Sequence, residues 1–213
     1  NNSYGGSRMS SLKLKHSGGN SVSIAAPSSN PASNRTLTVP SNADGEILTT
    51  TSPKTGSIIQ VVNTTVNDES TVSCISAWAD SSITCAITPS ATSSKILLSL
   101  SVSGEGNATN QRRFTHRIKK VISGGATTYI AGSATDRVGT LGATGDLTDN
   151  ATTTASSFSL ANYLDSPSTT SAVTYTLQIT YDSAGGSGTY YVNRNATDSS
   201  GGPRFVSWIT LME

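Results

Sequence analysis

The stretch Ala172–Tyr181, with the sequence AVTYTLQITY, alternates apolar and polar side chains along its length. Every second residue from Val173 to Tyr181 is valine, leucine, isoleucine or tyrosine, and the residues between them are threonine or glutamine. A period of two places one set of side chains on each face of an extended strand. The stretch therefore predicts a β-strand with one face buried in a core. Lys95–Val102, KILLSLSV, predicts a second strand rich in apolar residues.

Short strands of this kind recur through most of the chain, with turn residues at roughly ten-residue intervals. No segment has the period of 3.6 that a helix requires. This pattern is typical of an all-β sandwich, and we expect a jelly-roll-like arrangement. Residues 132–156 and Gly104–Asn107 are rich in glycine or small residues and are predicted to be loops. The predicted strands cover residues 58–62, 71–78, 82–88, 95–102, 112–122, 127–131, 157–164, 172–182, 188–194 and 204–212.

Composition excludes several classes of protein. Charged residues make up only 13% of the 213 residues, and the formal net charge is +1. Globular proteins average about 25% charged residues, so surface polarity here must come from Ser and Thr, about a third of the chain. A nucleic-acid-binding protein usually has a basic excess, so we expect no nucleic-acid partner. No run approaches the ~18 apolar residues of a membrane span, so we expect no membrane insertion.

Residues 1–52 differ in pattern from residues 53–213, and we predict a domain boundary between them. The first segment contains short strands with only two apolar residues each, too few to cover a core. Several identical chains wound around a shared axis would bury these side chains. We therefore predict a short β-shaft of intertwined strands followed by a β-sandwich head. The residues predicted to face the axis are Leu12, Leu14, Val22, Ile24, Leu37, Val39 and Ile47.

The chain has two cysteines, Cys74 and Cys85. A disulfide between them is one possibility, because the residues between them could turn a hairpin. Two free thiols buried as small apolar side chains are the other possibility.

Catalytic motifs are absent from the sequence. The two histidines, His16 and His116, are far apart, and no Gly-x-Ser-x-Gly, Walker or His-Glu-x-x-His motif occurs. Asp146 and Asp149 share a Gly-rich segment where they could contact Ca²⁺, although Asp is also common in ordinary turns. We expect no enzymatic activity, no cofactor and no metal site.

Arg112–Lys120 is a cluster of positive charge on a predicted strand. Strand alternation places Arg113, Arg117 and Lys119 on one face, with apolar residues on the other. This face would bind an acidic glycan or a phosphate group. Alternatively, the charges solvate an edge strand and prevent its association.

Aromatic rings and polar loops are the other candidate ligand-binding features. Rings in loops can stack on sugars, and the candidates are Trp78, Tyr129, Tyr163 and Tyr190. We expect Tyr175 and Trp208 to pack in the core instead. Loops on a rigid β-scaffold are frequent contact surfaces. The predicted contact loops are 104–111, 143–153, 182–188 and 195–203, with Asn107, Asn110, Asp146 and Asp198 as candidate ligand-binding residues.

Several stretches of the chain share a pattern with a known family. They are Gly56–Val62, Ile87–Leu97, Ser157–Tyr175, Gly188–Arg194 and Ser207–Glu213. In this order they resemble the C-terminal head domain of tail-fibre-like, receptor-binding proteins of marine tailed phages, cyanophages included. Leu37–Thr50 is similar to the junction between shaft and head in such fibres. The resemblance covers most of residues 35–213, and the segments Cys74–Cys85 and 112–120 depart from it.

The resemblance implies a homotrimeric virion appendage without an assigned enzymatic activity. We expect the trimer to bind a host surface glycan or outer-membrane protein, and other virion proteins to attach on its N-terminal side. One alternative is a structural fibre of the phage head, neck or baseplate that binds another virion protein. A polysaccharide depolymerase and a secreted lectin module are two further alternatives.

Overall fold

The structure is a computed structural model that describes residues 11–25, 56–75, 77–108, 113–132, 139–144, 153–181, 187–198 and 200–213. These ranges contain thirteen β-strands and no helix, so the predicted all-β class is confirmed. No helix in the described residues is long and apolar enough to cross a membrane. The chain divides into two compact units, Asn1–Ile47 and Leu48–Glu213. We call the second unit the head.

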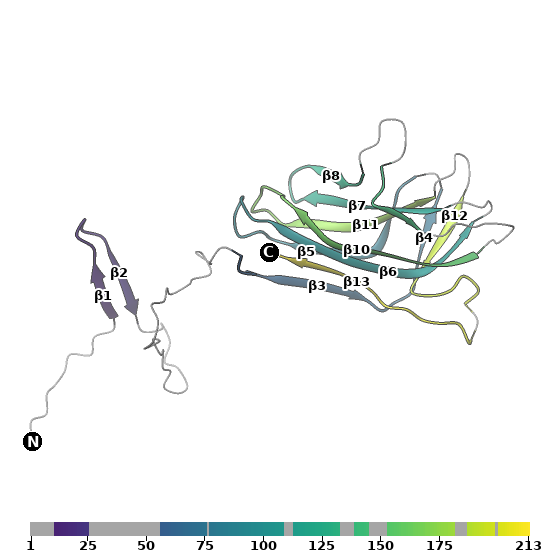
Figure 1. Cartoon of the computed structure of the whole chain (residues 1–213), viewed down its shortest axis with the longest axis horizontal. Coiled ribbons are helices and arrows are strands. Elements are labelled where there is room, and N and C mark those ends of the chain that lie inside the picture. Colours follow the sequence, from purple (N-terminus) through teal and green to yellow (C-terminus); the bar gives the residue numbers. More distant parts are fainter. Residues whose placement is uncertain are drawn as a thin grey trace, which may run out of the picture. The chain divides into compact units, whose positions relative to one another are not determined.

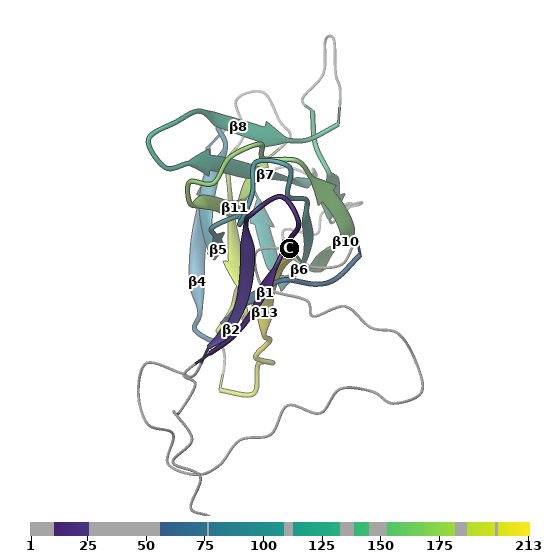
Figure 2. The same cartoon turned by 90° about the vertical axis from the view of Figure 1, so that its left-hand side faces the viewer.

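The described part of the first unit is a β-hairpin (Figure 2). Strand β1 (Ser11–Lys15) pairs antiparallel with β2 (Ser21–Ala25). Directly paired residues of an antiparallel ladder share one face. The register places the four apolar positions on one face, with Leu12 opposite Ile24 and Leu14 opposite Val22.

The first sheet of the head is built around β6 (Ile96–Ala108) and has six antiparallel strands in the described part of the chain (Figure 1). Strands β13 and β12 pair with successive parts of one edge of β6, and β10 pairs with the other edge. Strand β3 lies beyond β13, and β4 lies beyond β12. The bounds are β3 (Val61–Val66), β4 (Ser70–Cys74), β10 (Thr153–Asp165), β12 (Gly188–Val192) and β13 (Ser207–Met212).

The second sheet of the head has five described strands, all antiparallel. Strand β11 pairs with β5 on one side and with β7 on the other, and β8 and β9 share the far edge of β7. The bounds are β5 (Ala79–Ile87), β7 (Phe114–Ile122), β8 (Thr127–Ile130), β9 (Gly142–Thr144) and β11 (Val173–Tyr181).

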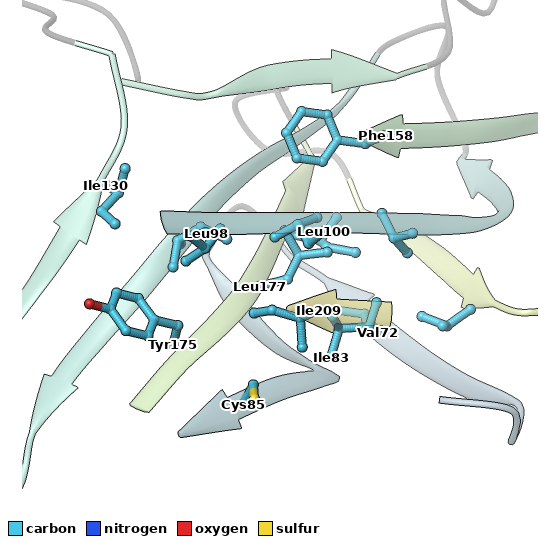
Figure 3. Close-up of a cluster of buried hydrophobic side chains, with 14 of the residues drawn as sticks. Val72, Ile83, Cys85, Leu98, Leu100, Ile130, Phe158, Tyr175, Leu177 and Ile209 are labelled. Carbon is cyan, nitrogen blue, oxygen red and sulfur yellow. The ribbon is translucent and has the colours of Figure 1, made fainter. Parts of the chain in front are cut away.

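The two sheets enclose one hydrophobic core, so the head has the character of a β-sandwich (Figure 3). The predicted apolar face is confirmed, because every second residue from Val173 to Tyr181 is buried in this core. The polar face differs from the prediction, since Thr176, Gln178 and Thr180 are buried as well. Leu98 and Leu100 of β6 contribute fully buried side chains from the first sheet. Burial of one such side chain stabilises a fold by about 1.5–3 kcal/mol relative to leaving it in water.

Gly104–Asn107 belongs to β6, so the predicted loop at this place is wrong. The glycines allow other groups to approach the strand closely instead of ending it. A Cβ on Gly106 would lie 2.2 Å from Phe114 Cε2, and one on Gly104 would lie 2.0 Å from the backbone oxygen of Tyr191 and 3.1 Å from Tyr190 Cε1. The rings of Phe114 and Tyr190 meet edge to face with centroids 5.6 Å apart. They fill the volume that β6 leaves open.

Two further expectations differ from the structure. Residues 132–156 contain β9 and the start of β10, so the prediction of one long loop is wrong. Trp208 is 37% exposed, so its expected place in the core is also wrong. The alternation of β13 buries Ser207, Ile209 and Leu211 and therefore turns Trp208 outward.

The fit between β6 and the Phe114 ring predicts a loss of stability in Gly106→Ala. The added Cβ would force the ring or the backbone to move, and overpacking of this kind costs about 1–3 kcal/mol. Gly201→Ala is the matched control, because no atom lies within 4 Å of a Cβ at that position. We expect calorimetry to show a lower unfolding midpoint for Gly106→Ala alone. Equal midpoints for the two variants would contradict this account of the packing.

His116, on β7, is fully buried and stacks on Phe158 with ring centroids 4.6 Å apart. Burial lowers the pKa of His116 from 6.5 to about 4, and the neighbouring Gly142 backbone offsets only part of this shift. The unfolded chain therefore takes up a proton at this residue before the folded chain does. The contribution to stability is complete above pH 6.5 and is lost as the pH falls toward 4.

We therefore expect the free energy of unfolding to fall by up to about 1.4 kcal/mol per pH unit in this window. Urea titrations at a series of pH values measure the slope. His116→Leu should flatten it, because the variant lacks the group that titrates. An unchanged slope in the variant would assign the acid sensitivity to other groups.

Candidate functional site

The strand registers define two ends of the head. At the proximal end, where the chain enters the first sheet, Met212 pairs with both Val61 and Leu97. At the distal end, Gly188 pairs with Cys74. The connection from β4 to β5, which crosses from one sheet to the other, also lies at the distal end.

On the outer face of the second sheet, the Arg117 guanidinium lies over two aromatic rings. Its Cζ is 4.2 Å from the centroid of the Trp78 ring and 3.8 Å from that of Tyr129. Arg117 Nε donates a hydrogen bond of 2.8 Å to Gln178 Oε1. We call the set Trp78, Asp80, Arg117, Lys119, Tyr129 and Gln178 the arginine platform.

Strand pairing brings the arginine platform together. Arg117 pairs with Gln178 across β7 and β11, and Gln178 pairs with Asp80 on β5. Lys119 pairs with Tyr129 on β8. These residues share the outer face because their neighbours in the β7 alternation are buried in the core.

Hydrogen bonds and charge fix the platform. Gln178 Nε2 donates to Asp80 Oδ1 at 2.7 Å, and Lys119 Nζ forms an ion pair with Asp80 Oδ2. Burial alone would raise the pKa of Asp80, but the hydrogen bonds from Lys119 and Gln178 outweigh it and hold the pKa below its usual value. Burial lowers the pKa of Arg117, although an arginine side chain remains protonated in proteins. Two cations and one anion give the platform a net charge of +1 at neutral pH.

The sequence predicts four members of the platform as candidate ligand-binding residues, and the structure brings them together: Trp78, Arg117, Lys119 and Tyr129. Arg113 is exposed and lies one residue before β7. Asp80 and Gln178 are not predicted from the sequence. Their position depends on which strands pair, and alternation within one strand carries no information about its partner.

A second candidate site, the distal groove, opens on the outer face of the first sheet. It has a volume of about 320 Å³ and is lined by Ser73, Ile75, Asn107, Ser187, Gly188, Thr189 and Tyr191. None of these side chains is charged. Asn107, a predicted ligand-binding residue, therefore lies in a groove whose hydroxyl and amide groups suit a neutral sugar.

The remaining predicted aromatic candidates are not loop residues. Tyr163 lies on β10 and packs against the core, half-buried. Tyr190 lies on β12 and is fully buried. Both loop predictions are wrong, because these rings complete the core that the small side chains of the sheet leave open. Tyr175 is buried as expected.

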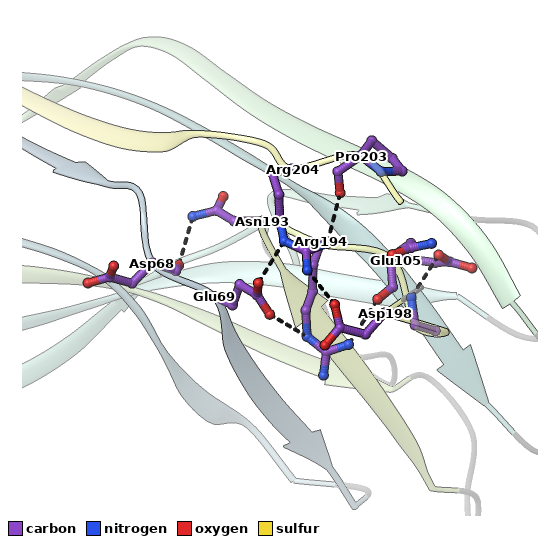
Figure 4. Close-up of polar contacts among 10 residues, drawn as sticks. Asp68, Glu69, Glu105, Asn193, Arg194, Asp198, Pro203 and Arg204 are labelled. Carbon is purple, nitrogen blue, oxygen red and sulfur yellow. Dashed lines mark hydrogen bonds and ion pairs between the residues drawn. The ribbon is translucent and has the colours of Figure 1, made fainter. Parts of the chain in front are cut away.

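Asp198 belongs to a network that fastens the segment after β12 (Figure 4). Its carboxylate forms an ion pair with Arg204. Glu69 pairs with Arg194 and Arg204 at 3.2 and 2.6 Å. The buried Asn193 side chain donates to two backbone oxygens at the β3–β4 turn, at 2.7 and 3.0 Å. The bonds of this network hold the chain in place, which gives it a structural role.

Asn110 and Asp146 lie outside the described residues, as do Leu37, Val39 and Ile47. For Leu12 and Val22 the structure describes the strands but not the side chains.

The cysteines are buried and free, which decides between the two alternatives in favour of thiols. Burial raises the pKa of Cys74 to about 12, so its thiol is protonated and unreactive at neutral pH. Among the described residues, no three His, Cys, Asp or Glu side chains lie close enough together to hold a metal ion.

Comparison with known proteins assigns no family to this chain. A scan against protein-family models finds no match, and a search of curated proteins finds no relative. The physical basis for a function is therefore the apolar face of the hairpin, the arginine platform and the distal groove.

Proposed function

We propose that the protein is a homotrimeric fibre of a phage virion that adheres to the host cell surface during adsorption. Residues 1–52 form an intertwined β-shaft, and residues 53–213 form a jelly-roll-like head. The head binds surface polysaccharide or lipopolysaccharide. The resemblance to tail-fibre head domains gives the class of protein, and the uncovered apolar face of the hairpin is the observation that carries the proposal.

Leu14 and Ile24 are 56% and 48% exposed although both are aliphatic. They share one face of the hairpin, whereas Lys13 and Ser23 pair on the other face. A two-stranded hairpin is marginally stable at best in water. Three such faces packed around one axis would remove this apolar surface from water. Burial of apolar surface stabilises an assembly by about 25 cal/mol per Å². Trimerisation therefore supplies the stability that a single hairpin lacks.

An apolar row crosses the outer face of the first sheet at the proximal end of the head. Val61, Met212, Leu97 and Leu164 are paired in this order across β3, β13, β6 and β10. Val61 and Leu164 are more than half exposed. The row contains no charged residue, so identical copies would not repel one another. It supports contact between heads at the end where the chain enters from the shaft segment.

The candidate ligand-binding surfaces lie away from that row. The distal groove is at the opposite end of the first sheet, and the arginine platform is on the outer face of the second sheet. Three weak sites in one particle bind a repeating polysaccharide with an avidity about 10²–10⁴ times that of one site. Adsorption by this mechanism is reversible and requires no bond-breaking step.

Binding of the labelled full chain to host cells tests adhesion. We expect saturable binding that purified surface polysaccharide competes away, with the polysaccharide unchanged in size. Absence of cell binding, together with an internal position on the virion, would replace adhesion by the structural-fibre alternative. Shortening of the polysaccharide would favour a depolymerase.

Light scattering of the full chain tests the shaft. We expect a mass of three chains for the wild type and a smaller trimer fraction for the double variant Leu14→Asp, Ile24→Asp, because two buried carboxylates per chain would have to lose water at the axis. The control is the double variant Ser21→Asp, Ser23→Asp, which places the same two charges on the other face of the hairpin. A monomeric wild type, or a double variant with an unchanged trimer fraction, would rule out the shaft.

A further inference from the structure

We infer that the arginine platform binds the carboxylate of an acidic sugar, with the uronic-acid residues of a surface polysaccharide as the ligand class. This site rests on the proposed adhesion, for which it would supply the contact with the host glycan. The N–H groups on the two terminal nitrogens of Arg117, which we call the fork, would hold the carboxylate. Trp78 and Tyr129 would contact the sugar ring.

Arg117 has hydrogen-bond donors that the described part of the protein does not use. Of its five N–H groups, only that on Nε has a hydrogen-bond partner there, the Gln178 side chain. The four N–H groups on the two terminal nitrogens form the planar fork that matches a carboxylate. Arg117 Cζ lies over both the Trp78 ring and the Tyr129 ring, so two aromatic side chains border the guanidinium. The terminal nitrogens, which have no hydrogen-bond partner among the described residues, are the part left for a ligand.

The fork is held in position before a ligand arrives. The Gln178 side chain that bonds Arg117 Nε is almost completely buried and donates its own hydrogen bond to Asp80. Two rings against it and this bond at Nε restrict the orientations of the guanidinium. Ordering a long side chain on binding costs about 0.5–1.5 kcal/mol, and here the fold has already ordered it.

The rings beside the fork favour a sugar over a simple anion. Tyr129 is 50% exposed, and Trp78 is half-buried. Sugars have apolar C–H faces that pack on aromatic surface, as apolar groups do generally. Inorganic phosphate would gain nothing from this surface. The pairing of a fork with exposed rings thus suits a sugar that itself carries the charge.

The net charge of the platform suits one carboxylate. Lys119 forms an ion pair with Asp80, and Asp80 also interacts electrostatically with Arg117, so two cations share one anion and one positive charge is left over. A phosphate monoester carries about −1.5 to −2 charges and would need a second free cation. Because the platform is at the surface, the attraction is screened by salt and affinity must fall as ionic strength rises.

Arg194 provides a matched control. It also lies over a ring, with its Cζ 4.4 Å from the centroid of Tyr191. Its Nε is paired with Glu69, and its Nη1 donates to the backbone oxygen of Asn195. Arg194→Lys therefore makes the same chemical change at a stacked arginine whose Nε and Nη1 already have protein partners.

Calorimetric titration of the full chain tests the site. The probes are hexasaccharides of alginate and of hyaluronan, which carry uronic acids, with neutral isomaltohexaose and inorganic phosphate as comparisons. We expect one or both acidic probes to bind, more weakly in about 0.5 M NaCl. Arg117→Lys keeps the charge and loses the fork, so affinity should fall about tenfold to a hundredfold. Tyr129→Ala, at an exposed position, should also weaken binding, and Arg194→Lys should not.

Three results would overturn the site: no binding of either acidic probe, equal binding of isomaltohexaose, or an unchanged affinity in both Arg117→Lys and Tyr129→Ala. Thermal midpoints of all variants check that each is folded. Cell binding separates this site from the proposed adhesion. If the Arg117→Lys variant binds host cells like the wild type, the proposed adhesion stands, but the arginine platform is not its contact with the host glycan. A wild type that binds the acidic probes but not cells keeps the site and removes adhesion.

Discussion

The alternation of β6 is the constraint on which the head depends, because this strand pairs with three others. Strands β12 and β13 follow one edge and β10 the other, so the register of β6 decides which face of all four strands is buried. A slip of one residue would exchange the buried Leu98 for Ser99 and empty the core. Toward the distal end β6 has glycine at the core positions, and the Phe114 ring from the opposite sheet takes the space beside Gly106. The two sheets therefore fit only in one relative position.

Polar side chains fasten the sandwich that this packing creates. The Glu213 carboxylate accepts hydrogen bonds from Ser90 N at 2.8 Å, from Ser94 Oγ at 2.5 Å and from the Gln60 side chain. Burial alone would raise the pKa of Glu213, but these hydrogen bonds hold the pKa at about 2, so the carboxylate stays charged at neutral pH. Asn193, with φ at 63°, turns the chain out of β12, a conformation that asparagine tolerates. With the strand ends held in this way, the outer faces of both sheets are free to carry binding groups.

Periodicity in the sequence predicts the strands of the core but not what the strands present to solvent. The stretch Val173–Tyr181 is unambiguous because five large side chains share one face. Gly104 and Gly106 mislead because glycine often marks a turn in a sequence, whereas here it marks the close approach of a distant strand, through the Tyr191 backbone at Gly104 and the Phe114 ring at Gly106. Trp208 misleads because a large apolar ring suggests burial, whereas the alternation of β13 gives the core face to Ser207, Ile209 and Leu211. The platform is predicted in part, from alternation within β7, and completed only by strand pairing, which places Gln178 beside Arg117.

Placing the candidate sites on strand faces has a consequence for affinity. Groups on paired strands are fixed by the ladder, so a ligand meets Arg117 and Tyr129 in one arrangement and little ordering energy is lost. The same flatness leaves most of a bound sugar in water, which limits what one site can contribute. A dissociation constant of the order of 1 mM corresponds to only about 4 kcal/mol. Under the proposed function, a protein with so few charges would therefore gain adhesion from repetition of a weak, rigid site rather than from one deep pocket. Uncovered apolar surface on the hairpin and at the proximal end of the head is consistent with that repetition, because it is the surface that identical chains would share.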